Sequence, residues 1–491
     1  MNLSRRRFLG TSLSASAALL ASGALTTLFE RVAAGADFRA EGYGPLLPDP
    51  AGLLDLPAGF HYRTFSTAIL GSTRDPRFSD RLSNGEFVPC QHDGMGAFAG
   101  PNGLTVLVRN HELEPGQSPR VDDRRARPYD ELAGGGTTTL WVDADRNLVR
   151  SLPSLSGTLR NCAGGVTPWG SWLSCEECAW LPGAVSATNV DLTPRVKMRH
   201  GYVFEVDARA EGLVHASPIT AMGRFRHEAT AVDAESGTVY LTEDRSDGLL
   251  YRYLPDFVAR GGRSPGELKV GDLARGGRLE ALRIVQRSGA RTQNHDAGTP
   301  LFQIGQRWQV DWVPIADPDP DCDMENDPAE EAADPFKRAG RTAATSTRAQ
   351  GFRAGCAQFA RTEGITIRGR TLYFCCTDGG TARLGQVWAL DAARDELMLL
   401  VEPNDVSVLD GPDNLTPAPN GDLIVCEDGT RDDFLVGITP QGRLYPLGRN
   451  AYNEMEFAGA CFSPDGGTLF ANIQEPGITF AIWGPWGRRR G

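Results

Sequence analysis

One strand–turn–strand pattern recurs six times along this chain of 491 residues. In each copy a polar or acidic residue opens a short apolar strand, a turn with glycine follows, and a second apolar strand ends in a mostly acidic cluster. The turn glycines are Gly103, Gly170, Gly237, Gly369, Gly421 and Gly467. Further strands that carry aromatic residues follow the hairpins. A unit of four strands that recurs about every 45 to 70 residues is typical of a β-propeller.

Six copies therefore predict an all-β fold, a six-bladed β-propeller that forms a single domain over residues 37–491. The longer interval between the third and fourth copies contains an acidic insertion at residues 317–345, which we interpret as a solvated excursion between two blades. Loose calcium binding is the alternative interpretation of this insertion. A β-sandwich or a parallel β-helix is the competing architecture, but neither explains four strands in each repeat.

The first 36 residues have the features of an export signal. Three arginines and Phe-Leu occupy residues 5–9, a weakly apolar run follows at residues 11–29, and small residues occupy 33–36. Paired arginines followed by Phe-Leu indicate export by the twin-arginine translocase. We therefore expect a periplasmic or secreted protein whose residues 1–36 form a twin-arginine signal peptide. The polar residues of the run disfavour the alternative, a transmembrane anchor, and no stable membrane span is expected after cleavage.

The charge of the chain limits its partners. It has 62 acidic and 50 basic residues and a formal net charge of −12. Nucleic-acid binders usually present a basic face, so we expect no nucleic-acid binding. The chain also lacks the Gly-x-x-x-x-Gly-Lys motif of a phosphate-binding loop. With so many carboxylates, we expect any chemistry to depend on bound metal ions.

The repeat also predicts which side chains meet. The first strand of each propeller blade lines the central channel, so equivalent repeat positions form rings around one axis. One such ring consists of Asp93, Cys162, Glu228, Glu363, Asn414 and Glu456. The acidic strand ends form a second ring, made of Glu112, Glu176, Glu177, Glu243, Asp244, Asp378, Glu427, Asp428 and Glu475.

Carboxylates gathered around one cavity repel one another unless cations lie among them. The two rings therefore predict a metal site at one mouth of the channel. Oxygen ligands favour Ca²⁺ or Mg²⁺, whereas a thiolate favours a transition metal such as iron. The alternative for any single acid is a hydrogen bond to the backbone amides of a turn.

Two residues of this region have distinctive chemistry. Small residues follow Cys162 in Asn-Cys-Ala-Gly-Gly, so backbone can approach whatever the sulfur binds. Arg361 lies two residues before Glu363, on the same face of a strand. It could bind an anion in the cavity with two hydrogen bonds, or form a salt bridge with one of the acids. Cys175 and Cys178 form either a disulfide or two core thiols, since a structural zinc site needs two more ligands.

Several of these motifs resemble the PhoX-type alkaline phosphatases, a family of exported β-propeller proteins. The resembling segments lie within residues 90–487, a range that covers nearly the whole mature chain. They are Arg109–Glu112, Asn161–Glu177, Gly223–Glu228, Tyr240–Asp244, Pro412–Asn414, Cys426–Gly429 and Phe462–Gly477. The stretch from Asn-Cys-Ala-Gly-Gly to Cys-Glu-Glu is quite specific, and the twin-arginine signal also fits the family.

The resemblance implies a cluster of Fe³⁺ and Ca²⁺ ions at one mouth of the channel. In this cluster Cys162 would bind iron and Arg361 would contact phosphate. The carboxylates that match metal ligands of the family are Glu176, Glu177, Glu228 and Glu363. Ring position adds further candidate metal ligands, namely Glu243, Asp244, Asp378, Asp413, Asn414, Glu427 and Asp428.

The implied reaction is hydrolysis of a small-molecule phosphomonoester to inorganic phosphate by a metal-activated oxygen nucleophile, with Arg361 stabilising charge. Cys162 would be a metal ligand of the catalytic site rather than the nucleophile. Thr362 departs from the family, which often carries proline between the Arg and the Glu. Two other function classes are open: a calcium-dependent lactonase or esterase built on a propeller, and a non-catalytic exported propeller that binds a partner with its loops.

Overall fold

The computed structural model describes residues 42–68, 80–122, 127–183, 196–295, 300–321 and 345–487. The predicted signal peptide at residues 1–36 and residues 322–344 of the predicted insertion lie outside the described residues. Strands dominate the described part of the chain, and its two α-helices, α3 (Asp256–Ala259) and α5 (Thr347–Arg353), are short. No helix in the described ranges is long and apolar enough to cross a membrane.

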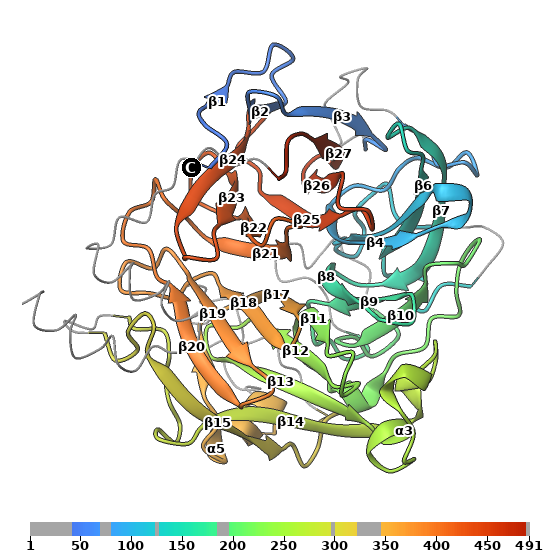
Figure 1. Ribbon diagram of the computed structural model, residues 1–491. Helices are drawn as coiled ribbons and strands as arrows, with labels where there is room; N and C mark the ends of the chain where they lie inside the picture. Colours follow the sequence, from blue (N-terminus) through green and yellow to red (C-terminus); the bar gives the residue numbers. More distant parts are fainter. Residues whose placement is uncertain are drawn as a thin grey trace, which may run out of the picture.

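A ring of inner strands surrounds the centre of the molecule (Figure 1). They contact one another in cyclic order, so that the last one lies beside the first. These inner strands are β4 (His92–Ala99), β8 (Asn161–Val166), β11 (His227–Val232), β17 (Thr362–Arg368), β21 (Pro412–Pro417) and β25 (Phe457–Phe462). One inner strand comes from each of the six sequence copies, which agrees with the predicted propeller-like arrangement.

Each inner strand begins an antiparallel group that runs outward through consecutive strands. The group of β8 has three strands in the described residues, and the other groups have four when β3 (His61–Phe65) is counted with β25. The remaining strands of these groups are β5 (Thr105–His111), β6 (Gly135–Val142), β7 (Leu148–Thr158), β9 (Ser171–Glu176), β10 (Val203–Asp207), β12 (Val239–Glu243), β13 (Gly248–Pro255), β14 (Gly277–Ile284), β18 (Thr371–Cys376), β19 (Gln386–Asp391), β20 (Glu396–Val401), β22 (Leu423–Glu427), β23 (Phe434–Ile438), β24 (Leu444–Asn450), β26 (Leu469–Ile473) and β27 (Ile478–Trp483).

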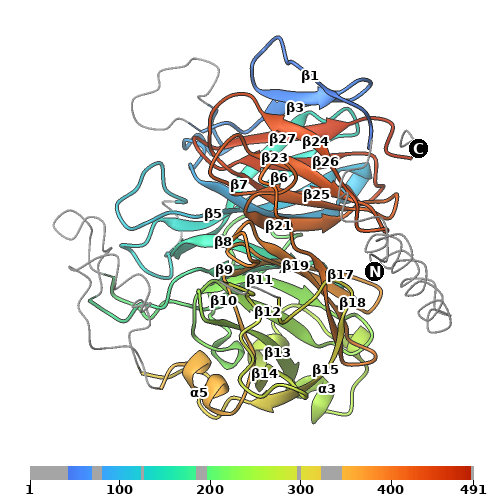
Figure 2. The same ribbon diagram turned by 90° about the vertical axis from the view of Figure 1, so that its left-hand side faces the viewer.

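Additional strands lie at the periphery of the ring. β15 (Arg307–Pro314) pairs with both β14 and β20, so the groups of β11 and β17 form one continuous sheet. β16 (Gln358–Phe359) pairs with β13, while β1 (Leu46–Leu47) and β2 (Leu54–Pro57) extend the sheet beyond β24. The helices α3 and α5 lie near β13, β14 and β15 in both views (Figure 1 and Figure 2).

The ring closes because distant parts of the chain pair. β3 is antiparallel to β27, from Phe65 opposite Thr479 to His61 opposite Trp483. Figure 2 shows β3 and β27 side by side, close to β1 and β24. The pairing completes the last strand group and protects an edge of β27 that would otherwise be open to another chain.

Small residues let the inner strands approach one another closely. A Cβ atom at Gly364 of β17 would lie 2.8 Å from Cα of Asn414 in β21, and the backbone of Ala163 crowds Gly94 of β4 in the same way. A residue with a side chain could not occupy these positions without moving a neighbouring strand. The close approach brings together the residues that directly precede these positions in each inner strand.

A local irregularity near the start of each inner strand changes the direction of its side chains. In five of these strands the pairing shifts between the first and fourth residues, as between His227 and Thr230 of β11. In β25 the shift lies one residue later, between Ala458 and Cys461. A β-bulge twists a strand and re-aims the adjacent side chains. The second residue of five inner strands thereby reaches one common cavity.

Candidate active site

A cavity of about 240 Å³ lies among the starts of the inner strands, at one end of the channel. Nine carboxylates, three guanidinium groups, one thiol and one carboxamide line it. They belong to Asp93, Glu112, Glu177, Glu228, Asp244, Glu363, Asp413, Asp428, Glu456, Arg160, Arg226, Arg361, Cys162 and Gln474. With all acids and arginines ionised, the cavity carries six more negative than positive charges, which favours the binding of cations.

Three carboxylates from three adjacent inner strands converge most closely. One oxygen each of Glu228, Glu363 and Asp413 lies within 4.8 Å of the other two, and all three side chains are buried. Burial, reinforced by the neighbouring negative charges, raises the pKa of each carboxyl well above its usual range. Hard oxygen donors that repel one another in this way fit a bound cation, because a cation removes the repulsion.

Cys162 adds a sulfur donor beside these carboxylates. It is the second residue of β8, is 4% exposed and lines the same cavity. Its Sγ lies 3.2 Å from the carbonyl oxygen of His227 and 3.5 Å from that of Glu228. Burial raises the pKa of the thiol well above its usual range, and the charges of Glu228 and Glu177 add to this effect. One sulfur among oxygens fits a transition metal that shares the site with a harder cation.

Arg361 joins two walls of the cavity. Its Nε donates to Oδ1 of Asp244 at 3.0 Å, and its Nη2 donates to Oε1 of Glu363 at 2.7 Å. The charges of Asp244 and Glu363 raise the pKa of the Arg361 guanidinium. Burial works against the ionisation of Asp244, but Arg361 and Arg226 outweigh it and hold the pKa of this carboxyl well below its usual range. The side chain of Arg361 is 38% exposed and lines the cavity.

The backbone at this repeat position adopts a conformation that residues with a side chain rarely take. The φ angle is +53° at Arg361 and +46° at Arg160. The equivalent Gln91 and Gly411, before β4 and β21, have φ angles of +51° and +59°. The conformation costs of order 1 to 3 kcal/mol at a non-glycine residue, so the surrounding structure must impose it. The backbone N–H of Arg361 donates to the carbonyl of Arg245 at 2.8 Å, which helps to hold it.

Three of the predicted metal ligands face away from the cavity. Glu176, Glu243 and Glu427 are each the last residue of a strand, and the carboxylate of each accepts from at least one backbone N–H group of its own strand group. Glu176, for example, accepts from the N–H groups of Leu159 at 2.9 Å and Gly201 at 2.8 Å. Neighbouring side chains of an extended chain point in opposite directions. The structure therefore brings the following residue of each pair, rather than these three, into the cavity lining.

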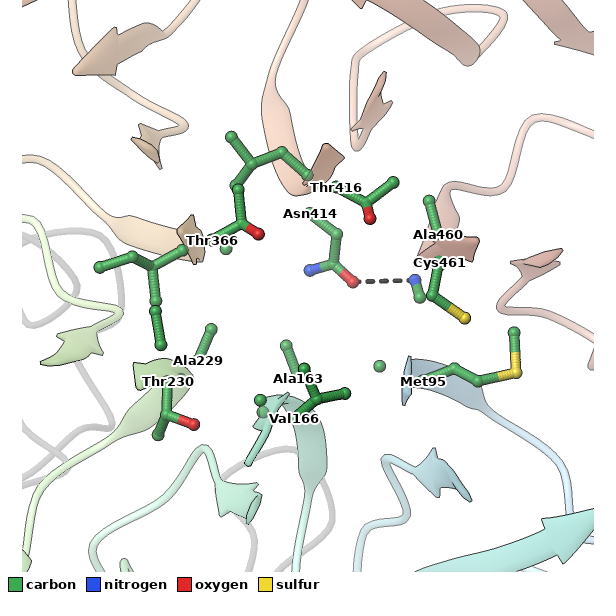
Figure 3. A pocket seen from close by; sticks show the side chains of 18 of the residues that line it. Met95, Ala163, Val166, Ala229, Thr230, Thr366, Asn414, Thr416, Ala460 and Cys461 are labelled. Atoms are coloured by element: carbon green, nitrogen blue, oxygen red, sulfur yellow. Dashed lines mark hydrogen bonds between the residues drawn. The ribbon is translucent and has the colours of Figure 1, made fainter. Parts of the chain in front are cut away.

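Two further predicted ligands also lie outside the cavity lining. Asp378 accepts from Arg383 at 3.2 Å, in the segment after β18. Asn414 accepts from the N–H of Gly459 at 2.8 Å and lines a second cavity of about 280 Å³ farther along the inner strands. Figure 3 shows this second cavity with Asn414 among small and apolar side chains. The strand register makes Asp413, not Asn414, equivalent to Glu228 and Glu363.

Sequence reasoning singled out Arg361 but missed the other two arginines of the cavity. Arg160 lies two residues before Cys162, and Arg226 lies two residues before Glu228. This is the same spacing that drew attention to Arg361, so the repeat itself carried the signal.

Four more residues of the cavity were not among the predicted site residues. Asp93, Glu112 and Glu456 belong to the predicted rings, whereas Gln474 does not. Gln474 directly follows β26, where most other copies carry an acid, so only its repeat position could have indicated its place. The predicted ring member Glu475 is absent from the cavity lining.

A Gly-x-Ser-x-Gly sequence at residues 262–266 lies outside the cavity. It forms an exposed turn that leads into the short 3₁₀ helix η4 (Pro265–Glu267), where the N–H of Ser264 donates to the Glu267 carboxylate at 2.9 Å. This serine caps a helix end and supplies no nucleophile to the cavity.

A protein-family model described as alkaline phosphatase PhoX matches residues 41–152 and 143–477 of the chain. The matched ranges cover more than half of the chain and contain every residue of the acidic cavity. A search of curated proteins finds no match.

Among solved structures, the fold is similar to that of Pseudomonas fluorescens PhoX in complex with vanadate, a transition-state analogue. The TM-score is 0.62 at 18% sequence identity, and the alignment covers 92% of this chain and 99% of that chain. A gluconolactonase from Xanthomonas campestris has a TM-score of 0.39 at 13% identity, with 90% and 98% of the two chains covered. The first likeness confirms the predicted fold class, and the second is too distant to support an argument.

Proposed function

This chain belongs to the PhoX alkaline phosphatase family, and from this membership we propose that its acidic cavity hydrolyses small-molecule phosphomonoesters to inorganic phosphate. As predicted from the sequence, the protein is therefore a phosphatase by family. One observation carries the assignment to this cavity: a partly exposed guanidinium, Arg361, lies beside three converging buried carboxylates. An anion site next to a cation site is what binding of a phosphate ester requires.

We assign the cations to Cys162, Glu228, Glu363 and Asp413, which include the three converging carboxylates and the adjacent thiol. Fe³⁺ is proposed beside the sulfur and Ca²⁺ among the carboxylates, because these donors suit those ions. Cations held there would supply Lewis acidity toward the phosphoryl group and activate water for attack.

Arg361 is assigned to binding of the phosphoryl group. Its Nε and Nη2 are held by Asp244 and Glu363, while among the described residues no acceptor contacts its Nη1. The two ion pairs fix the plane of the guanidinium, and the remaining donor is available to a phosphate oxygen. Because its neighbours raise its pKa, Arg361 stays charged at the alkaline pH at which such an enzyme would work.

Export by the twin-arginine translocase to the periplasm or the exterior is part of the proposal. Its support is the arginine-rich sequence at residues 5–9 and the small-residue site at 33–36. All nine described cysteines, including Cys175 and Cys178, are buried and form no disulfide. Such thiols suit a chain that folds in a reducing compartment before it enters an oxidising one.

The test is hydrolysis of p-nitrophenyl phosphate at alkaline pH by mature protein that was purified after native export and loaded with iron and calcium. Turnover is expected, and a strong chelator should abolish it. Cys162→Ala should lose turnover and iron together. Cys356→Ala is the matched control, because Cys356 is a buried thiol outside the cavity, and it should keep both.

Folded, metal-loaded protein without turnover would contradict the proposal. Hydrolysis of a gluconolactone by the same sample, with no phosphatase activity, would favour the lactonase alternative.

A further inference from the structure

The carboxylates of the cavity differ in whether positively charged or polar side chains bind their oxygens. Arg160 donates from Nη2 to Oε1 of Glu112 at 2.9 Å, and Gln474 donates to the other oxygen of Glu112 at 3.0 Å. Glu177 is held on both sides as well: Arg160 pairs with its Oε2 and Arg226 pairs with its Oε1. Both oxygens of both carboxylates are thus already bound to protein donors.

The same pattern continues toward β17. The Nη2 of Arg226 lies 3.7 Å from Oδ2 of Asp244, whose Oδ1 accepts from Arg361 at 3.0 Å. We call the five residues Arg160, Arg226, Arg361, Glu177 and Asp244 the arginine side of the cavity. Acids and arginines alternate along it, so each carboxylate of this side lies between two positive charges.

Four other carboxylates of the cavity have no such partners. Glu228, Asp413, Asp428 and Glu456, which we call the acidic side, form no ion pair with a basic side chain among the described residues. Their negative charges face one another, and those of Glu228 and Asp413 converge with Glu363. A cation bound on this side would neutralise carboxylates that lack a basic partner, whereas on the arginine side the guanidinium groups already do so.

Because only some of the carboxylates have arginine partners, electrostatics predicts that the two sets differ in metal binding. A cation that coordinates Glu177 must displace a guanidinium and then remain beside it, and like charges at contact distance repel strongly. Arginine cannot relieve the repulsion by losing a proton, because its pKa is too high. A cation on the acidic side meets carboxylates without an arginine partner. Glu363 beside it accepts from Arg361 with Oε1 only, and no basic side chain of the described residues contacts its Oε2.

We propose that Arg160 and Arg226 take the place of cations at Glu177 and Asp244, and so confine the metal cluster to the acidic side with Cys162 and Glu363. The inference rests on the proposed function, since it concerns the metal site of that phosphatase. It removes Glu177 and Asp244 from the metal ligands implied by the sequence and gives them a positioning role for the arginines. Substrate phosphate then binds between the cluster and the arginine side.

The experiment counts metal ions in purified, folded protein by mass spectrometry of the elements after dialysis against iron and calcium. Glu177→Gln and Asp244→Asn should keep the metal content of the wild type, whereas Asp413→Asn should lose at least one ion. Arg226→Met should gain about one Ca²⁺ per chain, because it frees carboxylate oxygens that calcium binds well. Arg252→Met, which breaks an ion pair with Glu280 outside the cavity, is the matched control and should change nothing.

Loss of a metal ion from both Glu177→Gln and Asp244→Asn, with unchanged thermal unfolding, would overturn the inference. So would an Arg226→Met protein that is folded and has the wild-type calcium content. The count does not depend on turnover, so a chain with this pattern of metal content but no phosphatase activity would refute the proposed function alone.

Discussion

At the scale of single residues, the setting of Arg361 decides what the cavity can bind. Two ion pairs and an unusual backbone angle hold its guanidinium beside the converging carboxylates. A less constrained arginine would have to be ordered when substrate binds, which would weaken binding. In the proposed reaction, its fixed position would instead present a donor where negative charge develops.

Replacement of Arg361 by Met should therefore lower kcat/KM for p-nitrophenyl phosphate by about 100- to 1000-fold, the usual effect of removing one donor to developing charge. Arg361→Lys should recover part of the loss, since lysine keeps the charge but not the planar pair of donors. Arg283→Met, which removes an ion pair with Asp311 on β14 and β15, is the control and should retain wild-type kinetics. Unchanged kcat/KM in Arg361→Met would show that the arginine contributes nothing to the reaction.

His200 predicts how stability depends on pH. Its Nδ1 lies 2.7 Å from Glu176 and its Nε2 lies 3.4 Å from Asp130. Burial alone would lower the pKa of His200, but the charge of Glu176 and the hydrogen bonds to both carboxylates outweigh it and raise the pKa to about 9. An unfolded histidine has a pKa of about 6.5, so folding favours the protonated form. The stabilisation is complete below pH 6.5 and is lost as pH rises toward and through 9.

The contribution of His200 to the free energy of unfolding of the wild type should thus fall by roughly 3 kcal/mol between pH 6.5 and pH 9.5. His200→Gln should show a flatter dependence over the same interval, and His61→Gln, at an exposed position, should follow the wild type. Chemical denaturation at the two pH values measures the difference. Parallel curves for the wild type and His200→Gln would contradict the assignment.

At the scale of the strand, consecutive acids have divided roles. The first acid of the pairs Glu176–Glu177, Glu243–Asp244 and Glu427–Asp428 bonds the backbone of its own strand group, and the second lines the cavity. Sequence reasoning treated both members as metal ligands. The residue types are alike, and only the direction of the strand end separates them.

This division predicts opposite effects for neighbouring substitutions. Glu427→Leu leaves the buried N–H group of Asp410 and the partly buried N–H group of Phe434 without their acceptor and should destabilise the protein by about 2 kcal/mol or more. Asp428→Asn should leave the free energy of unfolding nearly unchanged and instead weaken calcium binding. Urea unfolding of metal-free protein and calcium titration of each variant distinguish the two. Equal destabilisation by both substitutions would show that the two acids share one role.

At the scale of the whole molecule, closure of the ring holds the cavity together. The inner strands β4 and β25 come from distant parts of the chain, and the pairing of β3 with β27 completes the last strand group. The cavity includes residues from all six strand groups, so its shape depends on that closure.

A chain that begins at Thr67 and so lacks β3 should unfold at a temperature about 10 °C or more below one that begins at Gly59 and keeps it. The two chains differ by eight residues and both lack β1 and β2, so the comparison isolates the pairing with β27. Differential scanning calorimetry measures the shift. Equal midpoints would mean that β3 is not needed to close the ring.

The sequence alone determined the repeat, the all-β propeller, the family and a set of residues from which the cavity is drawn. The repeat and the fold follow from strand periodicity, turn glycines and acidic strand ends, which are local sequence patterns. The family follows from the resemblance of motifs such as Asn161–Glu177. Cys162, Glu228, Glu363 and Arg361 were found in this way, and all four line the cavity.

Only the tertiary structure decided which of these residues face one another. It placed Asp413 rather than Asn414 in the cavity and added Arg160 and Arg226. The physical reason is twofold. A β-bulge of one residue changes the face of the sheet to which the adjacent side chains point. No local sequence pattern indicates the position of the bulge. Two of the ion pairs, Arg226–Glu177 and Arg361–Asp244, join different strand groups, so their distances depend on how closely glycines allow the inner strands to pack.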